Sequence, residues 1–241
     1  MRSKRQMANI LNRYEKFDIY ARTQRGQEIL QPSELTIAEL DHGAQLANTY
    51  KKARNHYQAS KAAQQRIRTE NKSAHEEAQN GVRHLRHLIL RAFPNRSDLM
   101  TYFELQPHFT RNLTETQTQS NEREWETLAQ RLINWPELIA RIRKLNEEDK
   151  TNLTKKGGTE DLIEAIDHNI KTFKTTYRTW QTHQTQTTAA KQTRDQTWAQ
   201  FETWFVNAAT TTRSQIKTKR LPDPQSELKS FALKGRLRDP I

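Results

Sequence analysis

The sequence predicts an all-α protein: an elongated antiparallel helical bundle with two very long helices, formed by tandem duplication. Apolar residues recur every three or four positions over long stretches, which is the pattern of amphipathic helices. Only 6 glycines and 7 prolines occur in 241 residues, too few for a chain with many turns. The same landmarks also occur twice, so the two halves of the chain are expected to share one design.

The duplication rests on two landmarks, each found twice at an offset of about 126 to 129 residues. The first pairs Ile37, Leu40, Asp41 and His42 with Ile163, Ile166, Asp167 and His168. The second pairs Pro94-x-x-Ser97-Asp98-Leu99 with Pro222-x-x-x-Ser226-Glu227-Leu228, and Phe103-x-Leu105 with Phe231-x-Leu233. Repeat 1 therefore covers about 4–105 and repeat 2 about 121–233. We expect residues 1–241 to form a single elongated domain with a shared core.

The first helix is expected from about Lys4 to Leu30. Its apolar residues keep three- and four-residue spacing from Met7 to Ala21. Pro32 ends this helix, because proline has no backbone N–H to donate and its ring clashes with the preceding turn.

A second helix is expected to run from Thr36 almost to Pro94, with no proline between them. Thr36-x-x-Glu39 has the form of a capping box, in which the two side chains satisfy backbone N–H groups at the helix start. At 1.5 Å per residue, nearly sixty residues span roughly 85–90 Å, which is why the body is expected to be elongated.

The remaining elements follow the same order. A short helix near Ser97–Leu105 and a polar connection lead to a third helix, which starts close to Asn121 and should kink or restart at Pro136. Gly157 and Gly158 break it. A fourth helix then runs from about Thr159 to Arg220 without glycine or proline.

Both long helices have apolar ends and a polar middle, which we call the polar waist. It covers Ser60–Asn71 in the second helix and Gln184–Arg194 in the fourth. Three interpretations stay open for it. The waist is a solvated gap, a polar layer that fixes the register of the helices, or a polar ligand pocket between them.

Composition excludes several classes of protein. Only 33% of the residues are hydrophobic and the mean hydropathy is −1.04, yet the helical spacing of the apolar residues argues against disorder. The chain has no cysteine, so it has no disulfide, no thiol catalysis and no cysteine-containing zinc site. No secretory signal or membrane span is predicted. The expected location is the cytoplasm.

The formal net charge of +12 is concentrated on the two long helices. Residues 51–91 hold ten basic and three acidic residues, and residues 171–220 hold nine basic and two acidic residues. One row on the second helix could follow the phosphates of a nucleic acid. The candidate anion-binding residues of this row are Lys51, Arg54, Lys61, Arg68, Lys72 and Arg86. The competing interpretation is a basic face that is solvated or paired within the molecule.

Metal and catalytic chemistry have little support in the sequence. Glu39-x-x-His42 has the spacing used by di-metal sites in four-helix bundles. The equivalent stretch of repeat 2 lacks this spacing, because the residue three positions before His168 is Ala165 and not a glutamate. No catalytic motif occurs. We therefore expect no enzymatic activity, no cofactor and no metal.

The C-terminal stretch Leu233-x-Gly235-x-Leu237-Arg238-Asp239-Pro240 follows the second short helix. Together with the duplicated long helix and the Pro-x-x-Ser landmarks, it resembles a loose group of bacterial proteins of unknown function that repeat a long-helix unit and often end in a similar element. The stretch that follows Leu105 lacks the glycine and the Arg-Asp pair. The resemblance implies this fold and a bacterial origin, and it implies no activity.

The predicted function is that of a non-enzymatic binding protein, whose basic long helices associate with an anionic partner through charge. The expected partner is a nucleic acid or an acidic protein, without sequence specificity and without a membrane, and oligomerisation is left open. The alternative is a structural or assembly scaffold with no nucleic-acid role. A di-metal carboxylate oxidoreductase is a weaker alternative.

Overall fold

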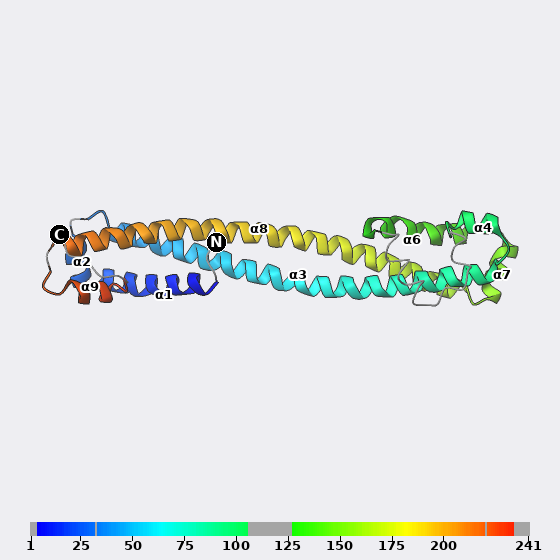
Figure 1. Cartoon of the computed structure of the whole chain (residues 1–241), viewed down its shortest axis with the longest axis horizontal. Coiled ribbons are helices and arrows are strands. Elements are labelled where there is room, and N and C mark those ends of the chain that lie inside the picture. Colours follow the sequence, from blue (N-terminus) through cyan, green and yellow to red (C-terminus); the bar gives the residue numbers. More distant parts are fainter. Residues whose placement is uncertain (1–3, 32, 106–126, 220, 234–241) are drawn as a thin grey trace. The chain divides into compact units, whose positions relative to one another are not determined.

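The computed structural model describes residues 4–31, 33–105, 127–219 and 221–233, and all regular structure in these ranges is helical. Two helices are very long: α3 spans Ile37–Ala92 with 56 residues, and α8 spans Glu160–Thr218 with 59 residues. The prediction of an all-α bundle with two very long helices is therefore confirmed (Figure 1). Their predicted bounds are correct to within a few residues.

The chain divides into two compact units. Unit 1 combines Met1–Lys61 with Gln186–Ile241, and unit 2 is the continuous segment Ala62–Thr185. Each long helix contributes one part to each unit, and each unit has its own hydrophobic core. One domain with one shared core was expected; the described residues form two cores instead. The physical reason is the polar waist, which contains both unit boundaries and supplies few apolar side chains.

Unit 1 contains α1 (Lys4–Ala21), α2 (Gln24–Leu30) and α9 (Pro224–Ser230), together with the first part of α3 and the last part of α8. Its core is rich in aromatic rings. Tyr14 meets Phe201 edge to face with centroids 5.1 Å apart, and Phe17 contacts both Phe205 and Phe231. Burial of these rings stabilises the unit.

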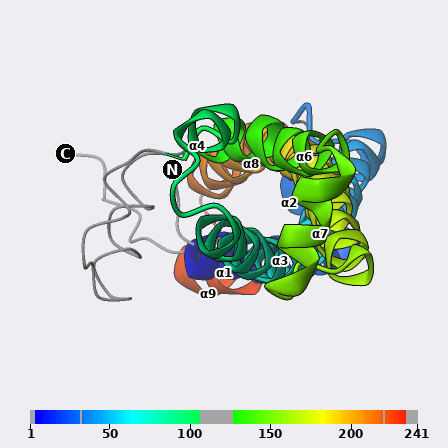
Figure 2. The same ribbon diagram turned by 90° about the vertical axis from the view of Figure 1, so that its right-hand side faces the viewer.

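Unit 2 contains α4 (Ser97–Tyr102), α6 (Leu128–Arg143) and α7 (Glu147–Lys155), which gather around the last part of α3 and the first part of α8 (Figure 2). The fully buried side chains of its core include Trp135, Leu85 and Ile139. Trp135 of α6 contacts Phe173 of α8 with ring centroids 5.8 Å apart. The short helix α6 therefore covers the apolar end of the long helices.

Each core is built by both repeats. In unit 1 the beginning of repeat 1 packs on the end of repeat 2, and in unit 2 the end of repeat 1 packs on the beginning of repeat 2. Equivalent ion pairs join the helices: Arg22 Nη1 lies 2.8 Å from Asp41 Oδ1, and Arg143 Nη2 lies 2.9 Å from Asp167 Oδ2. The repeats thus reproduce each other in contacts as well as in sequence.

The predicted first helix is wrong in one respect, because the chain breaks at Arg22 and Thr23 to give α1 and α2. The Thr23 hydroxyl accepts a hydrogen bond from the N–H of Gly26 at 3.0 Å and caps α2. A Cβ on Gly26 would lie only 2.1 Å from the carbonyl oxygen of Tyr20. This close turn requires glycine, and apolar periodicity alone gives no sign of it.

The third predicted helix also differs. It continues through Pro136 as α6, and the break comes near Asn146, whose side chain accepts from the N–H of Asp149 at 2.8 Å and caps α7. Trp135 and Leu138, on either side of the proline, are both buried and hold α6 together. Gly157, with a φ of 99°, ends α7 as predicted. The expected start at Asn121 lies outside the described residues, as does the tail Gly235–Pro240.

Candidate anion-binding surface

The six candidate residues of the basic row all lie on α3, but they do not share one environment. Unit 1 holds Lys51, Arg54 and Lys61, and unit 2 holds Arg68, Lys72 and Arg86. The exposed members are Lys61, Arg68 and Lys72, whereas Lys51, Arg54 and Arg86 are partly buried. The middle of the row is thus open to solvent and its two ends are partly covered.

The covering has a structural cause at each end. In unit 1, α1 packs against α3, and Lys51 Nζ lies 2.8 Å from Glu15 Oε1. In unit 2, Val82, one helical turn before Arg86, is only 1% exposed, because it belongs to the hydrophobic core. Lys51 is therefore paired with a carboxylate of the same molecule, as the competing interpretation expected. Lys72 lies 3.7 Å from Glu76, and both side chains are largely exposed, so this pair holds the lysine weakly.

The two repeats share a basic segment of the long helix, and this segment defines the basic surface more clearly than the row on α3 does. Residues 42–69 of α3 contain six basic residues and no acidic one, and residues 168–194 of α8 contain five and none. These acid-free stretches start at equivalent positions, just after Asp41 and Asp167. The basic members of the stretches are Lys51, Lys52, Arg54, Lys61, Arg66, Arg68, Lys171, Lys174, Arg178, Lys191 and Arg194.

Arg194 of α8 was not among the predicted residues, and it has the most defined environment of the group. Its Nε donates to Asp195 Oδ1 at 2.8 Å, and its guanidinium carbon lies 4.4 Å from the centroid of the Tyr57 ring. Only 11% of its side chain is exposed. The available sequence signal was its match to Arg68 at an offset of 126 residues, the offset that relates Asp167 to Asp41.

Arg54 of α3 lies in the same part of unit 1. Its Nε is buried and has no hydrogen-bond partner among the described residues. Burial raises the pKa of the nearby Tyr50, while the positive charges of Arg54 and Arg194 act in the opposite direction. Arg54 lies between Tyr50 and Tyr57 along α3, and these two rings contact Trp198 and Arg194 of α8.

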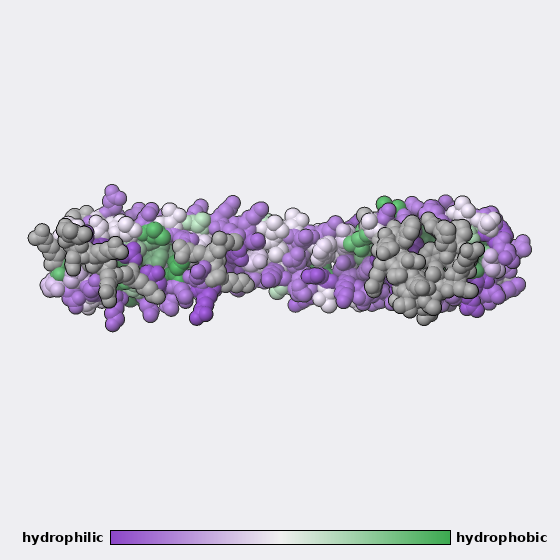
Figure 3. Space-filling model, viewed as in Figure 1, coloured by the Kyte–Doolittle hydropathy of each residue, from purple (hydrophilic) through white to green (hydrophobic). Residues whose placement is uncertain are grey.

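The two units differ strongly in charge. Unit 1 has 21 basic against 11 acidic residues, a net charge of +10, whereas unit 2 has 19 against 17, a net charge of +2. Hydrophilic side chains cover most of the described surface on the face drawn in Figure 3, and small hydrophobic patches show in both units. The strongest attraction for an anion is thus expected at unit 1.

Polar contacts join the long helices within each unit, at the waist in unit 1 and at its edge in unit 2. In unit 1 the Thr187 hydroxyl donates to the carbonyl oxygen of Ser60 at 3.2 Å, and in unit 2 the Thr176 hydroxyl donates to Asn71 Oδ1 at 3.2 Å. Thr187 is 9% exposed. Buried polar contacts of this kind favour one register over its neighbours, which supports the register interpretation of these residues.

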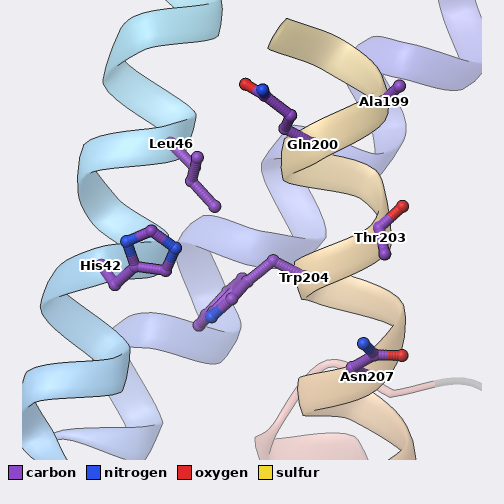
Figure 4. Close-up of a pocket in the computed structure, with 7 residues that line it drawn as sticks. All are labelled: His42, Leu46, Ala199, Gln200, Thr203, Trp204 and Asn207. Carbon is purple, nitrogen blue, oxygen red and sulfur yellow. The ribbon is translucent and has the colours of Figure 1, made fainter. Parts of the chain in front are cut away.

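Unit 1 also has an open groove of about 660 Å³ between α3 and α8 (Figure 4). Leu46 and Trp204 form its apolar part, and a Cβ on Gly43 would lie 2.1 Å from the Trp204 ring, so glycine makes room for the indole. The other lining residues are His42, Ala199, Gln200, Thr203 and Asn207. A lone imidazole with no carboxylate among these residues offers no acid–base pair for catalysis.

The di-metal spacing of Glu39 and His42 does not assemble a set of ligands in the described part of the chain. Glu39 Oε2 accepts from Trp204 Nε1 at 3.4 Å, and its backbone N–H donates to the Thr36 hydroxyl at 3.3 Å. His42 lines the groove instead. The described residues contain no group of three or more histidine, aspartate or glutamate side chains placed to hold a metal ion.

No described helix combines the length and the apolar composition needed to cross a membrane. Comparison of the chain with protein families, with curated proteins and with solved structures gives no significant match.

Proposed function

We propose that this protein is a non-enzymatic binding protein, and that the acid-free stretches of α3 and α8 associate through charge with the phosphate backbone of a nucleic acid. The observation that carries the proposal is the repetition of these stretches. Both repeats keep at least five basic residues and no acidic residue over equivalent parts of the long helix. Solubility alone does not require the exclusion of acids, since mixed charges keep a helix soluble equally well.

The pattern of exposure supports the same function. Lys52, Lys61, Arg66, Arg68 and Arg178 are exposed, and the described residues offer none of them an ion-pair partner. Such side chains can neutralise phosphates and release the counterions condensed on a nucleic acid, which makes the affinity depend on salt. Neither long helix presents a motif for base readout, so the binding has little sequence preference.

The experiment measures the affinity of the intact protein for a short DNA duplex as a function of salt concentration. Log affinity should fall linearly with log salt, with a slope near 0.9 for each phosphate neutralised. Replacing Lys61 and Arg68, two exposed members of the α3 stretch, together by glutamine should lower the slope by about two, because each contact contributes close to one. Glutamine keeps helix propensity, so helicity should not change.

A matched control replaces Lys155 and Lys156, two exposed lysines at the end of α7 outside the acid-free stretches, by glutamine. The net charge falls equally, but the slope should stay at the wild-type value. Equal slopes for the two double variants would show that total charge, and not the stretch, determines binding.

A scaffold is the second candidate, because several basic residues connect helices inside the molecule. Besides Lys51 with Glu15, Arg25 Nη2 lies 2.9 Å from Glu227 Oε1, and Arg143 pairs with Asp167. If the wild type is not retained on DNA or RNA even at about 50 mM salt, the scaffold replaces the binding protein. Retention on polyglutamate but not on nucleic acid would point to an acidic protein partner. Metal analysis of the purified protein tests the di-metal oxidoreductase.

A further inference from the structure

Two arginines from different helices lie close together in unit 1. Arg54 of α3 lies between Tyr50 and Tyr57 at helical spacing, so the three side chains share one face of the helix. On α8, Trp198 contacts the Tyr50 ring with centroids 4.9 Å apart, and Arg194 lies 4.4 Å from the centroid of the Tyr57 ring. Among the described residues, the carboxylate that contacts this pair of arginines is that of Asp195, which accepts from Arg194. The cluster therefore holds two positive charges against one negative charge, partly shielded from water.

Arg194 is held in one orientation. Its Nε and Nη2 both donate to Asp195 Oδ1, and the Tyr57 ring lies against its guanidinium group at 4.4 Å. A carboxylate and an aromatic face together fix the plane of an arginine side chain. With 11% of the side chain exposed, little of it is left to water. An arginine fixed in this way is prepared to bind a ligand with a small loss of side-chain entropy.

Arg54 has a donor that the described residues do not use. Its Nε is buried and lacks a hydrogen-bond partner among them. A buried N–H without an acceptor is rare in folded proteins, because it has lost water without replacing it. An anion with several oxygen atoms would satisfy this donor and offset the excess positive charge.

We propose that Arg54 and Arg194 together bind a phosphate group in unit 1, with Tyr57 and Asp195 as positioning residues that hold Arg194. Guanidinium groups suit a phosphate because their planar donors match pairs of phosphate oxygens, and the tetrahedral anion can serve two arginines from different directions. If the phosphate belongs to a nucleic acid, the site deepens the proposed function and rests on it. A free phosphate group would use the same chemistry.

The test follows the Nε–Hε signals of arginine by NMR in the full-length protein. The probe is inorganic phosphate, followed by a short single-stranded oligonucleotide. Two Nε–Hε signals should move on addition of phosphate, and they should be the ones lost in Arg54→Lys and in Arg194→Lys. Each variant keeps its positive charge. Arg54→Lys loses the unused Nε–H donor, and Arg194→Lys loses the guanidinium donors that Asp195 does not occupy. The affinity of each variant for phosphate should therefore fall about tenfold or more, the usual effect of losing a hydrogen bond to a charged group.

Lys52→Gln is the matched control. Lys52 is an exposed basic residue of the same stretch of α3, so this change removes a charge but leaves the two arginines in place. It should leave both shifted signals and the phosphate affinity close to wild type. A tenfold loss in this variant would overturn the proposal, because it would show that general charge attracts the phosphate.

The outcomes separate this site from the proposed function. If phosphate moves neither signal, or if both lysine variants bind it as the wild type does, the site is wrong, while the salt slope on duplex DNA still tests the function independently. If phosphate moves both signals but the protein binds no nucleic acid, the site stands and the nucleic-acid partner is wrong. Should Arg54→Lys fail to fold, Arg194→Lys decides the result, since it replaces no buried donor that lacks a partner.

Discussion

At the residue scale, the environment of His75 keeps its ring neutral. His75 stacks on Trp135 with an interplanar angle of 16°, and Arg131 Nη1 lies 2.9 Å from His75 Nε2. Because a guanidinium group can only donate, Nε2 must accept the hydrogen bond and carry no proton. Burial, followed by the charge of Arg131, lowers the pKa of His75 below its ordinary value of 6.5, with Glu76 acting in the opposite direction.

This arrangement predicts a loss of stability in mild acid. The folded pKa of His75 lies below the unfolded value, so the unfolded chain binds more protons as pH falls. The contribution of His75 to stability is complete above pH 6.5 and is lost as pH falls through the lowered pKa. Urea unfolding at about pH 7.5 and about pH 5 should show a lower midpoint in acid.

The variant His75→Gln provides the comparison, because its amide oxygen can accept from Arg131 and does not titrate. Its unfolding midpoint should change less between the two pH values than that of the wild type. His84→Gln, which changes an exposed histidine of the same helix, should keep the wild-type pH dependence. An equal acid loss in His75→Gln and the wild type would contradict the assignment.

At the scale of the element, both repeats end their last short helix in the same way. Glu104 and Ala232 have positive φ angles of 56° and 53°, and the following N–H groups of Leu105 and Leu233 each donate to a carbonyl oxygen five residues earlier at 2.9 Å. This is the Schellman motif, whose left-handed residue is usually glycine. A residue with a Cβ is strained there, and the buried leucines hold the chain in place.

We therefore expect Ala232→Gly to stabilise the protein by about 1 kcal/mol, because glycine adopts a positive φ without the Cβ clash. The matched control is Ala199→Gly, an exposed position in the middle of α8. It should destabilise by about 1 kcal/mol, the usual cost of glycine in a helix. Thermal unfolding of both variants measures the difference, and a lower melting temperature for Ala232→Gly would show that the strain is absent.

At the scale of the whole molecule, the repeats and the compact units do not coincide. Unit 2 is one continuous segment, Ala62–Thr185, whereas unit 1 needs both Met1–Lys61 and Gln186–Ile241. Repeat 1, residues 4–105, contributes to both cores and completes neither. The segment that contains a complete core is therefore different from the segment that was duplicated.

Fragments should distinguish the two segments. A fragment of residues 62–185 keeps every residue of its core and should be helical, monomeric and cooperative in thermal unfolding. A fragment of residues 4–105 lacks its partner helices and should unfold without cooperativity, or dimerise to replace them. Circular dichroism and sedimentation measure both properties. A cooperative monomer of residues 4–105 would contradict this division.

Most of the fold could be predicted from the sequence because its signals are local and long. The long helices have apolar residues at regular spacing, threonine at the start and proline beyond the end, and these features depend on neighbours in the chain. The break before Gly26 was missed, since it depends on contact between that residue and the Tyr20 backbone. The sequence left open whether the helix kinks or restarts at Pro136, and α6 continues through it because tertiary packing holds the helix together on both sides.

The site was less predictable because it combines residues from two helices. Spacing along α3 found Arg54 but also selected Lys51, which pairs with Glu15. Arg194 was not predicted because the acidic Asp195 follows it directly in the sequence. Its stacking on Tyr57 depends on which residues of α8 face α3. The spacing of residues within one helix does not reveal which residues of a second helix lie opposite them.

The continuity of unit 2 also has a consequence for biosynthesis. A ribosome releases residues 62–185 before it has made the C-terminal half of unit 1, so unit 2 can form while the first sixty residues still lack their partners. During that interval the aromatic side chains of α1 stay uncovered, and they become buried only after the end of α8 and α9 emerge. Translation that stops early would leave a folded unit 2 attached to an N-terminal segment whose apolar side chains are exposed. Such a segment is a substrate suited to chaperones or proteases.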